Sequence, residues 1–219
     1  MNDSGLLLQF LVVSPLLIVS LVLHELAHGW VAYRLGDPTA KAHGRLTLNP
    51  IKHLDTWGTI MLAVTFLGSG GSFFFGWAKP VPVDPRHLRH PKRDFALIAA
   101  AGPASNLIMA TIGAILFAMI PHPAPGDIAA RAVISPLFTL VVEFVQLNVL
   151  LAVFNMIPVP PLDGGNVLLG VLPHAGARVV EQLRPYGFLI LYALMLTGTL
   201  GYLLGPVAYS ILRVLLRIP

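Results

Sequence analysis

Residues 21–34, LVLHELAHGWVAYR, decide how the rest of this 219-residue chain is interpreted. They hold His24, Glu25 and His28 in the spacing H-E-x-x-H, within a run that is otherwise almost wholly apolar. On a helix, His24 and His28 lie one turn apart on one face, where two neutral imidazoles are able to bind a divalent metal, usually zinc. Glu25 directly follows His24, so its carboxylate is able to reach a water on that metal. The pattern indicates two ligands and a base on a helix apolar enough to lie in a bilayer, where such groups are costly without a use.

The composition is that of an integral membrane protein. Hydrophobic residues make up 56% of the chain and charged residues only 11%, whereas a soluble domain has about a quarter charged residues. We interpret the net charge of +4 as charge on cytoplasmic loops, and we expect no nucleic-acid partner, since few basic residues cluster with aromatic ones. The chain has no Cys, so any metal site must use His, Asp or Glu.

The apolar runs predict an all-α polytopic membrane protein with about five to six membrane-embedded segments. The first run is longer than the roughly 20 residues needed to span a bilayer, and Gly36-Asp37-Pro38 end it. The expected segments are 6–35, 57–76, 94–120, 132–157 and 186–204, with a last apolar stretch after a kink at Gly205-Pro206.

Two stretches between the first and third of these segments are expected to be extended. Residues 45–48 alternate in polarity, and Asn49-Pro50 follow as a turn, so we expect a short β-strand or hairpin near the metal. In residues 77–85, WAKPVPVDP, alternating prolines enforce an extended chain. If their edges are open, residues 45–48 and 81–84 are able to hold an unwound substrate strand by edge pairing.

Residues 57–76 are expected to re-enter the membrane on the side from which they came, with a spanning helix as the alternative. The glycine-rich patch 68–72, GSGGS, argues against an ordinary spanning helix. Residues 34–55 carry four Lys or Arg and residues 77–93 carry five, whereas residues 121–131 carry one. Since Lys and Arg favour the cytoplasmic side, re-entry places both basic loops inside, whereas a full crossing puts the more basic loop outside.

Several polar or small residues near the later segments have two interpretations each. Asp163 is either a turn residue after prolines or a third metal ligand; re-entry brings it to the side of the histidines, and the absence of Cys favours the ligand. Asn155 either caps a helix end or donates a hydrogen bond to a developing oxyanion. Glu143 fits a structural hydrogen bond better than an ion path, and Gly102-Pro103 and Asn106 fit close helix packing better than chemistry.

Four motifs in this order resemble the site-2 protease family, whose members are zinc metalloproteases embedded in membranes. The motifs are HELAHGWVAYRLGD at 24–37, GWAKPVPVDP at 76–85, AGPASN at 101–106 and FNMIPVPPLDGG at 154–165. The resemblance extends over about 21–166, most of the chain. Thr56 departs from it, since relatives with these motifs often have Pro after HLD, but this difference affects a loop and not the chemistry.

The resemblance implies one zinc ion per chain, held by His24, His28 and Asp163, with Glu25 as the base. It also implies that Asn155 positions the substrate or the oxyanion. Family members cut transmembrane segments of other membrane proteins, so membrane proteins with such segments, together with the lipid bilayer, are the expected partners. The sequence does not indicate an oligomeric state.

We therefore expect residues 1–219 to form one membrane-embedded metalloprotease domain, a minimal form without a PDZ or CBS module. It is expected to be a zinc metalloendopeptidase that hydrolyses peptide bonds in or near transmembrane segments, with a zinc-bound water activated by Glu25. The expected location is the plasma membrane of a prokaryote, with the active site toward the cytoplasmic side. A metal-ion transporter and a catalytically inactive membrane scaffold are the alternatives. A base that does not bind the metal favours the enzyme.

Overall fold

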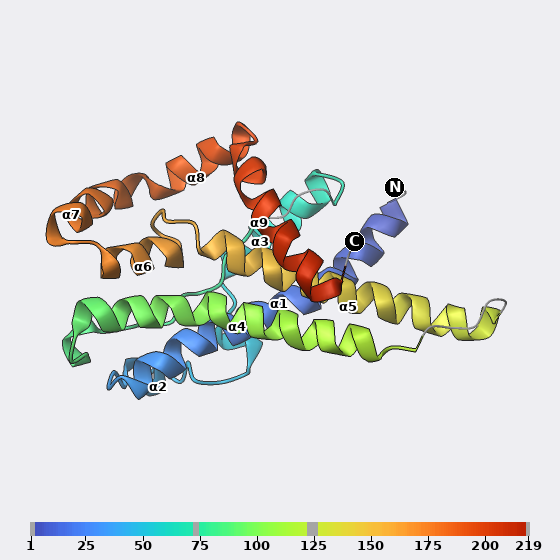
Figure 1. The fold of residues 1–219 in the computed structure, drawn as a ribbon, viewed down its shortest axis with the longest axis horizontal. Helices are drawn as coiled ribbons and strands as arrows, with labels where there is room; N and C mark the ends of the chain where they lie inside the picture. The colour runs from blue at the N-terminus through green and yellow to red at the C-terminus, as the bar shows by residue number, and fades with distance from the viewer. Residues whose placement is uncertain (1–2, 72–74, 122–126, 218–219) are drawn as a thin grey trace. The chain divides into compact units, whose positions relative to one another are not determined.

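The computed structural model describes residues 3–71, 75–121 and 127–217, and the regular secondary structure of these residues is helical (Figure 1). Three short 3₁₀ turns, Pro50–Lys52, Pro85–His87 and Arg184–Tyr186, lie in the connections. The α-helices in this part of the chain are α1 (Asp3–Arg34), α2 (Thr39–Ala42), α3 (Thr56–Gly68), α4 (Pro91–Met119), α5 (Ile128–Asn155), α6 (Asp163–Val171), α7 (His174–Leu183), α8 (Gly187–Leu196) and α9 (Thr199–Leu216).

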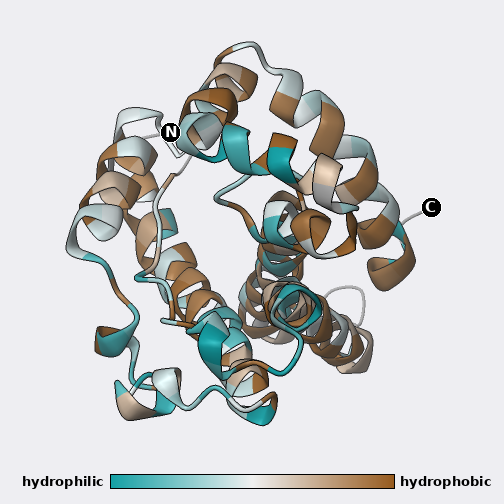
Figure 2. Ribbon diagram, turned by 90° about the vertical axis from the view of Figure 1, so that its left-hand side faces the viewer, coloured by the Kyte–Doolittle hydropathy of each residue, from teal (hydrophilic) through white to brown (hydrophobic). Residues whose placement is uncertain are grey.

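The long helices are apolar all round, as membrane-spanning helices are. Figure 2 shows hydrophobic residues on several sides of these helices rather than in one stripe. On α4, Leu107, Ile108 and Ile112 are all exposed. Five stretches of the described chain are long and apolar enough to cross a membrane, which confirms the expected all-α polytopic membrane protein. These stretches are Gly5–Arg34, Pro91–Met119, Ala130–Asn155, Ala175–Leu196 and Thr199–Leu216.

The helix break near the C-terminus differs from the sequence-based expectation. Residues 186–204 are divided between α8 and α9, because Gly198 adopts a left-handed conformation with a φ of 70° and ends the helical path there. The Gly205-Pro206 pair, where a kink was expected, lies inside α9. A glycine in the left-handed region stops a helix more sharply than a proline that a bilayer-embedded helix accommodates.

The contacts within the chain define two compact units, and the first contains the HExxH helix. This unit comprises Met1–Gly102 and Val167–Val171, and the second comprises Pro103–Asn166 and Leu172–Pro219. In the first unit, Ala32 near the end of α1 is fully buried against Leu88 and Ile98, so the end of α1, the loop before α4 and the beginning of α4 share one core.

In the first unit, α3 is too short to cross a bilayer, and the chain after it runs back along it. Its 13 residues extend about 20 Å, whereas the hydrocarbon core is about 30 Å thick. The hydroxyl of Thr65 accepts a hydrogen bond from the Phe75 N–H at 2.8 Å, and it donates to the Met61 carbonyl of its own helix at 2.7 Å. Nearer the start of α3, Leu54 and Ala78 form an antiparallel bridge.

This close return depends on a glycine in α3. A Cβ on Gly58 would collide with the backbone carbonyl of Trp77, so only glycine lets the returning chain lie directly on the helix. The chain therefore passes Thr65 first and Leu54 last on its way back, and the segment begins and ends at the same end of α3. This doubled-back path is the one that a re-entrant segment at residues 57–76 would take, and re-entry into the membrane stays a prediction.

The short strand or hairpin expected at residues 45–48 does not form. These residues adopt bends and irregular structure, and the Leu54–Ala78 bridge is the β pairing that the described residues contain. Their polar groups are used within the loop instead, since the Thr47 carbonyl lies 2.9 Å from Nε2 of His53 and the Thr47 hydroxyl accepts from the Asn49 N–H at 3.2 Å. Alternating polarity here reflects loop contacts and not a pleated strand.

The second unit is built on close packing of its long helices. Ala110 and Ala114 of α4 pack with Val145 and Val149 of α5 and with Leu216 of α9. Small residues on one side and β-branched residues on the other let the helices approach closely, as is typical in membranes.

A buried amide pair joins α4 to α5 in this unit. Asn106 donates to the side chain of Asn148 at 2.9 Å, and Asn148 donates to the Phe144 carbonyl at 2.9 Å. Both side chains are fully buried, so each polar group needs a partner inside the protein. The interpretation of Asn106 as a helix-packing residue is confirmed.

Candidate metal centre

Two imidazoles of α1 face one another in the core of the first unit. His24 and His28 are one helical turn apart, and both are buried, with 5% and 9% of their surface exposed. Their Nε2 atoms lie 3.1 Å apart. The helix therefore presents two nitrogen donors at one point, as the H-E-x-x-H spacing predicts.

The hydrogen bond on the far side of His28 fixes its tautomer. Nδ1 of His28 lies 2.6 Å from the carbonyl oxygen of Ile98 on α4. A carbonyl oxygen only accepts, so Nδ1 carries the proton and the lone pair of the neutral ring is on Nε2, directed toward His24. An imidazole held by a backbone carbonyl in this way is the usual arrangement of a metal-binding histidine.

Gly102 of α4 leaves the space in front of the two Nε2 atoms. A Cβ at this position would lie 2.5 Å from Nε2 of His24 and closer still to Nε2 of His28. Any other residue would fill the point on which both nitrogens converge. Sequence reasoning assigned Gly102 to helix packing and missed this role, although its place in the AGPASN motif was a signal.

The geometry of the histidine pair fits zinc. Two nitrogen ligands at about 2.0–2.1 Å from a tetrahedral zinc lie about 3.4 Å apart, close to the 3.1 Å between the two Nε2 atoms. Neutral imidazole is a ligand that zinc prefers, and the bond from Nδ1 of His28 to the Ile98 carbonyl leaves Nε2 as the atom that would bind the metal.

Glu25 points toward the extended chain that follows α3. Its Oε2 accepts a hydrogen bond from the backbone N–H of Val81 at 2.9 Å. The side chain of Val81 also lies against α1, because a Cβ on Gly29, one turn after Glu25, would be 3.1 Å from Cγ1 of Val81. The base predicted from the sequence is therefore held by a backbone group that the sequence analysis did not single out.

Residues 79–84, KPVPVD, which we call the brace, are fixed at both ends. At the first end, the Lys79 N–H donates to the His53 carbonyl at 2.7 Å, and the buried guanidinium of Arg45 donates to the Lys79 carbonyl. At the other end, the Asp84 N–H donates to Oδ2 of Asp37 at 2.8 Å. The brace is thus attached to the loop before α3 and to the turn after α1.

The brace differs from the open strand edge expected at residues 81–84. Pro80 and Pro82 have no N–H, and the N–H groups of Lys79, Val81 and Asp84 all donate to groups of the protein. Pairing with a substrate strand requires donors as well as acceptors along one edge. Because the protein itself uses three of the four donors in this stretch, edge pairing at residues 81–84 is disfavoured.

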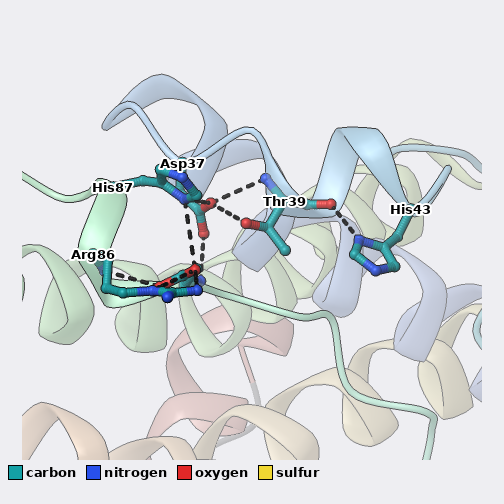
Figure 3. A network of polar contacts seen from close by, with 6 residues as sticks. Asp37, Thr39, His43, Arg86 and His87 are labelled. Atoms are coloured by element: carbon teal, nitrogen blue, oxygen red, sulfur yellow. Dashed lines mark hydrogen bonds and ion pairs between the residues drawn. The ribbon is translucent and has the colours of Figure 1, made fainter.

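Asp37 is the centre of the polar network that holds the end of the brace (Figure 3). Its fully buried carboxylate accepts hydrogen bonds from the N–H and hydroxyl of Thr39 and from the Asp84 N–H, and Nδ1 of His87 lies 3.2 Å from it. Burial raises the pKa of Asp37, but the hydrogen bonds from Thr39, Asp84 and His87 outweigh it and lower the pKa overall. Hydrogen bonds and charge from Arg86 lower the pKa of Asp84 to about 2. Both carboxylates are therefore charged at neutral pH.

The two remaining predicted site residues belong to the second unit. Asn155 is the last residue of α5, and its side-chain N–H donates to the Leu151 carbonyl of the same helix at 2.9 Å. Asp163 is the first residue of α6, where the partial positive charge of a helix N-terminus favours a carboxylate. Their roles toward the histidine pair remain predictions.

Comparisons with known proteins agree with a membrane metallopeptidase. The family described as peptidase family M50 matches residues 119–198. The candidate zinc metalloprotease YwhC of Bacillus subtilis is 41% identical over 201 residues, which cover 91% of this chain and 86% of YwhC. The candidate zinc metalloprotease Rip2 of Mycolicibacterium smegmatis is 30% identical over 184 residues, which cover 84% of this chain and 66% of Rip2. No solved structure matches this chain.

The relatives and the five apolar helices place this chain among the zinc metallopeptidases of the membrane. The chain belongs to peptidase family M50, the site-2 protease family. The resemblance inferred from the four motifs is confirmed, and zinc is the cofactor of the family.

The space at Gly102 gives a test of the metal centre. Gly102→Ala places a methyl group between the two Nε2 atoms, so we expect purified protein to lose most of its zinc, measured as zinc per chain by elemental analysis. Alanine favours a helix over glycine by about 1 kcal/mol, so helix destabilisation cannot explain such a loss. Gly205→Ala on α9, where a Cβ meets nothing within 4 Å, is the control and should keep its zinc. Normal zinc in Gly102→Ala would contradict this geometry.

Proposed function

We propose that residues 1–219 work as one intramembrane zinc metalloendopeptidase domain that hydrolyses peptide bonds in or near transmembrane segments of other membrane proteins. The observation that carries this proposal is the buried His24–His28 pair with Glu25 beside it, on a helix apolar enough to span a bilayer. Burying these polar side chains in an apolar span is costly, and metal binding and catalysis account for it.

We propose His24, His28 and Asp163 as the protein ligands of one zinc ion per chain. Three protein ligands and an open position are typical of catalytic zinc sites, and a chain without Cys must take the third ligand from His, Asp or Glu.

In the proposed mechanism, Glu25 is the general base and then the general acid. Zinc, when bound, polarises the scissile carbonyl and lowers the pKa of a water that it binds. Glu25 takes a proton from the attacking water and later gives a proton to the leaving amine. The Val81 N–H donates to Oε2 of Glu25, so Oε1 is the oxygen proposed to accept the proton of the water.

Asn155 is proposed to position the substrate or donate to the oxyanion. A side-chain amide has two N–H donors, and one of those of Asn155 is bonded to the Leu151 carbonyl. That bond orients the amide, and the second N–H is then available to an oxygen of the substrate.

We propose that the site faces the cytoplasm, in the plasma membrane of a prokaryote. The basic loops 34–55 and 77–93 flank the doubled-back segment around α3, whose two ends meet at the Leu54–Ala78 bridge. Positively charged loops favour the cytoplasmic side. His24 and His28 lie in the last third of α1, next to the first of these loops.

The alternatives from other classes are a metal-ion transporter and an inactive scaffold. Membership of a peptidase family favours the enzyme. So does Glu25, whose carboxylate is bonded to a backbone N–H and is adjacent in sequence to a metal-binding histidine. The expected partners are membrane proteins with transmembrane segments.

The role of Glu25 is tested by Glu25→Gln. Removing the base should lower the rate of cleavage of a transmembrane substrate in proteoliposomes by about 10²–10⁴-fold, while zinc per chain stays as in the wild type. Glu181→Gln on α7 removes the same charge from an exposed position and should change neither quantity. Cleavage by Glu25→Gln at the wild-type rate would refute the mechanism.

The third ligand is tested by Asp163→Ala. Loss of one of three protein ligands should leave substoichiometric zinc after gentle extraction and dialysis, measured by elemental analysis. Asp127→Ala is the matched control, because it removes the same charge from the N-cap of α5 and costs about 1 kcal/mol of helix stability without touching the site. If both variants keep a full zinc ion, Asp163 is not a ligand.

The orientation is tested by labelling single cysteines in this Cys-free chain. His90→Cys lies in the exposed part of the basic loop before α4, and Ile128→Cys at the start of α5 is 82% exposed. A membrane-impermeant thiol reagent added to intact cells should label position 128 and not position 90. Labelling of position 90 from outside the cell would contradict the proposed orientation.

A further inference from the structure

We propose that the backbone N–H of Val81 is a positioning group for the Glu25 carboxylate, and that the brace exists to hold this N–H in place. The inference rests on the proposed function, since it concerns the base of that reaction. It assigns a role to a backbone atom on a segment separate from the metal ligands.

The contact itself has the character of a strong hydrogen bond. The Val81 N–H lies 2.9 Å from Oε2 of Glu25, and bonds to a charged carboxylate are about twice as strong as neutral ones. Glutamate has several rotatable bonds, so an unsupported carboxylate on a helix surface visits many positions. One fixed donor at one oxygen selects the rotamer and directs the other oxygen to a defined point.

The sequence of the brace makes Val81 the donor at this point. Pro80 and Pro82 on either side have no N–H and fix their own φ angles near −65°. Between Lys79 and Val83, the Val81 N–H is therefore the one backbone donor, and it is directed at Glu25. The flanking prolines also keep the chain extended and limit its motion around the donor.

The anchors of the brace lie on both sides of the Glu25 contact. The Lys79 backbone is held by the His53 carbonyl and by Arg45, and the Asp84 N–H is held by Asp37. Glu25 and Asp37 are 12 residues apart, one within α1 and one in the turn that follows it. Two carboxylates thus fasten one extended segment along the end of the helix that carries the base, and the side chains of Val81 and Leu46 lie over Gly29.

Fixing a catalytic group in this way affects the rate of the chemical step more than substrate binding. A small misplacement of a reacting group costs up to about 10²-fold in rate. We therefore expect loss of the Val81 N–H to lower kcat at least tenfold, with KM and zinc content close to those of the wild type.

The first experiment measures the hydrogen bond itself, in the full zinc-loaded chain and without reference to activity. Amide hydrogen exchange is followed by NMR in ¹⁵N-labelled protein in micelles. Glu25→Ala should speed exchange of the Val81 amide at least tenfold, whereas Glu25→Gln, whose side-chain oxygen still accepts, should speed it less. The Asp84 amide, bonded to Asp37, is the internal control and should keep its rate. Unchanged exchange of Val81 in Glu25→Ala would overturn the proposal.

The second experiment tests the positioning role. Val81→Pro removes the backbone N–H. Val81→Ala keeps the N–H but, like Val81→Pro, loses the contact of the valine side chain with α1. Val81→Pro should show the tenfold loss of kcat with KM within about twofold, and Val81→Ala should restore most of kcat. Equal kcat values for the two variants, with equal zinc content and an equally protected Asp84 amide, would overturn the proposal.

The two experiments separate this inference from the function on which it rests. If the wild-type chain holds zinc but cleaves no transmembrane substrate, the proposed function fails, while the exchange result still reports whether Val81 holds Glu25. If cleavage occurs and Val81→Pro cleaves as well as Val81→Ala, the function stands and the positioning role fails.

Discussion

The desolvation of polar groups in an apolar helix is the constraint on which the structure of the first unit depends. Two imidazoles and a carboxylate on α1 must each find partners where water is scarce. Nδ1 of His28 uses the Ile98 carbonyl, Glu25 uses the Val81 N–H, and the two Nε2 atoms converge on the space left by Gly102. The beginning of α4, the brace and the loop before α3 are therefore arranged around a few atoms of α1.

The family and the chemistry of the site follow from side chains that the sequence displays. The H-E-x-x-H spacing requires only a helix to bring His24 and His28 together, and a helix is what so apolar a run forms. The doubled-back path of residues 57–76 was also predictable, because glycine content and loop charge both argued against a crossing. The pairing of His24 and His28 on α1 and the doubled-back path around α3 were thus predictable from local rules.

The features of the site that the sequence did not predict depend on a backbone N–H or on the absence of a side chain. Val81 contributes an N–H, which every residue but proline has, and Gly102 contributes the lack of a Cβ. Neither leaves a side-chain signature, and both matter only because distant segments meet at α1. The strand expected at residues 45–48 was wrong for a related reason, since Arg45 reaches the Lys79 carbonyl and draws its segment into a loop. Tertiary contacts here outweigh a local polarity pattern.

The doubled-back path around α3 has a consequence for how this protein is able to vary. A segment that returns to the side from which it started leaves the direction of every later helix unaltered, whatever its length. Lengthening or shortening the tip near Gly70 and Gly71, both in the left-handed region, would change the reach of the loop without moving its two ends, which the Leu54–Ala78 bridge holds together. The length of this loop is therefore independent of the path that the chain takes before Leu54 and after Ala78.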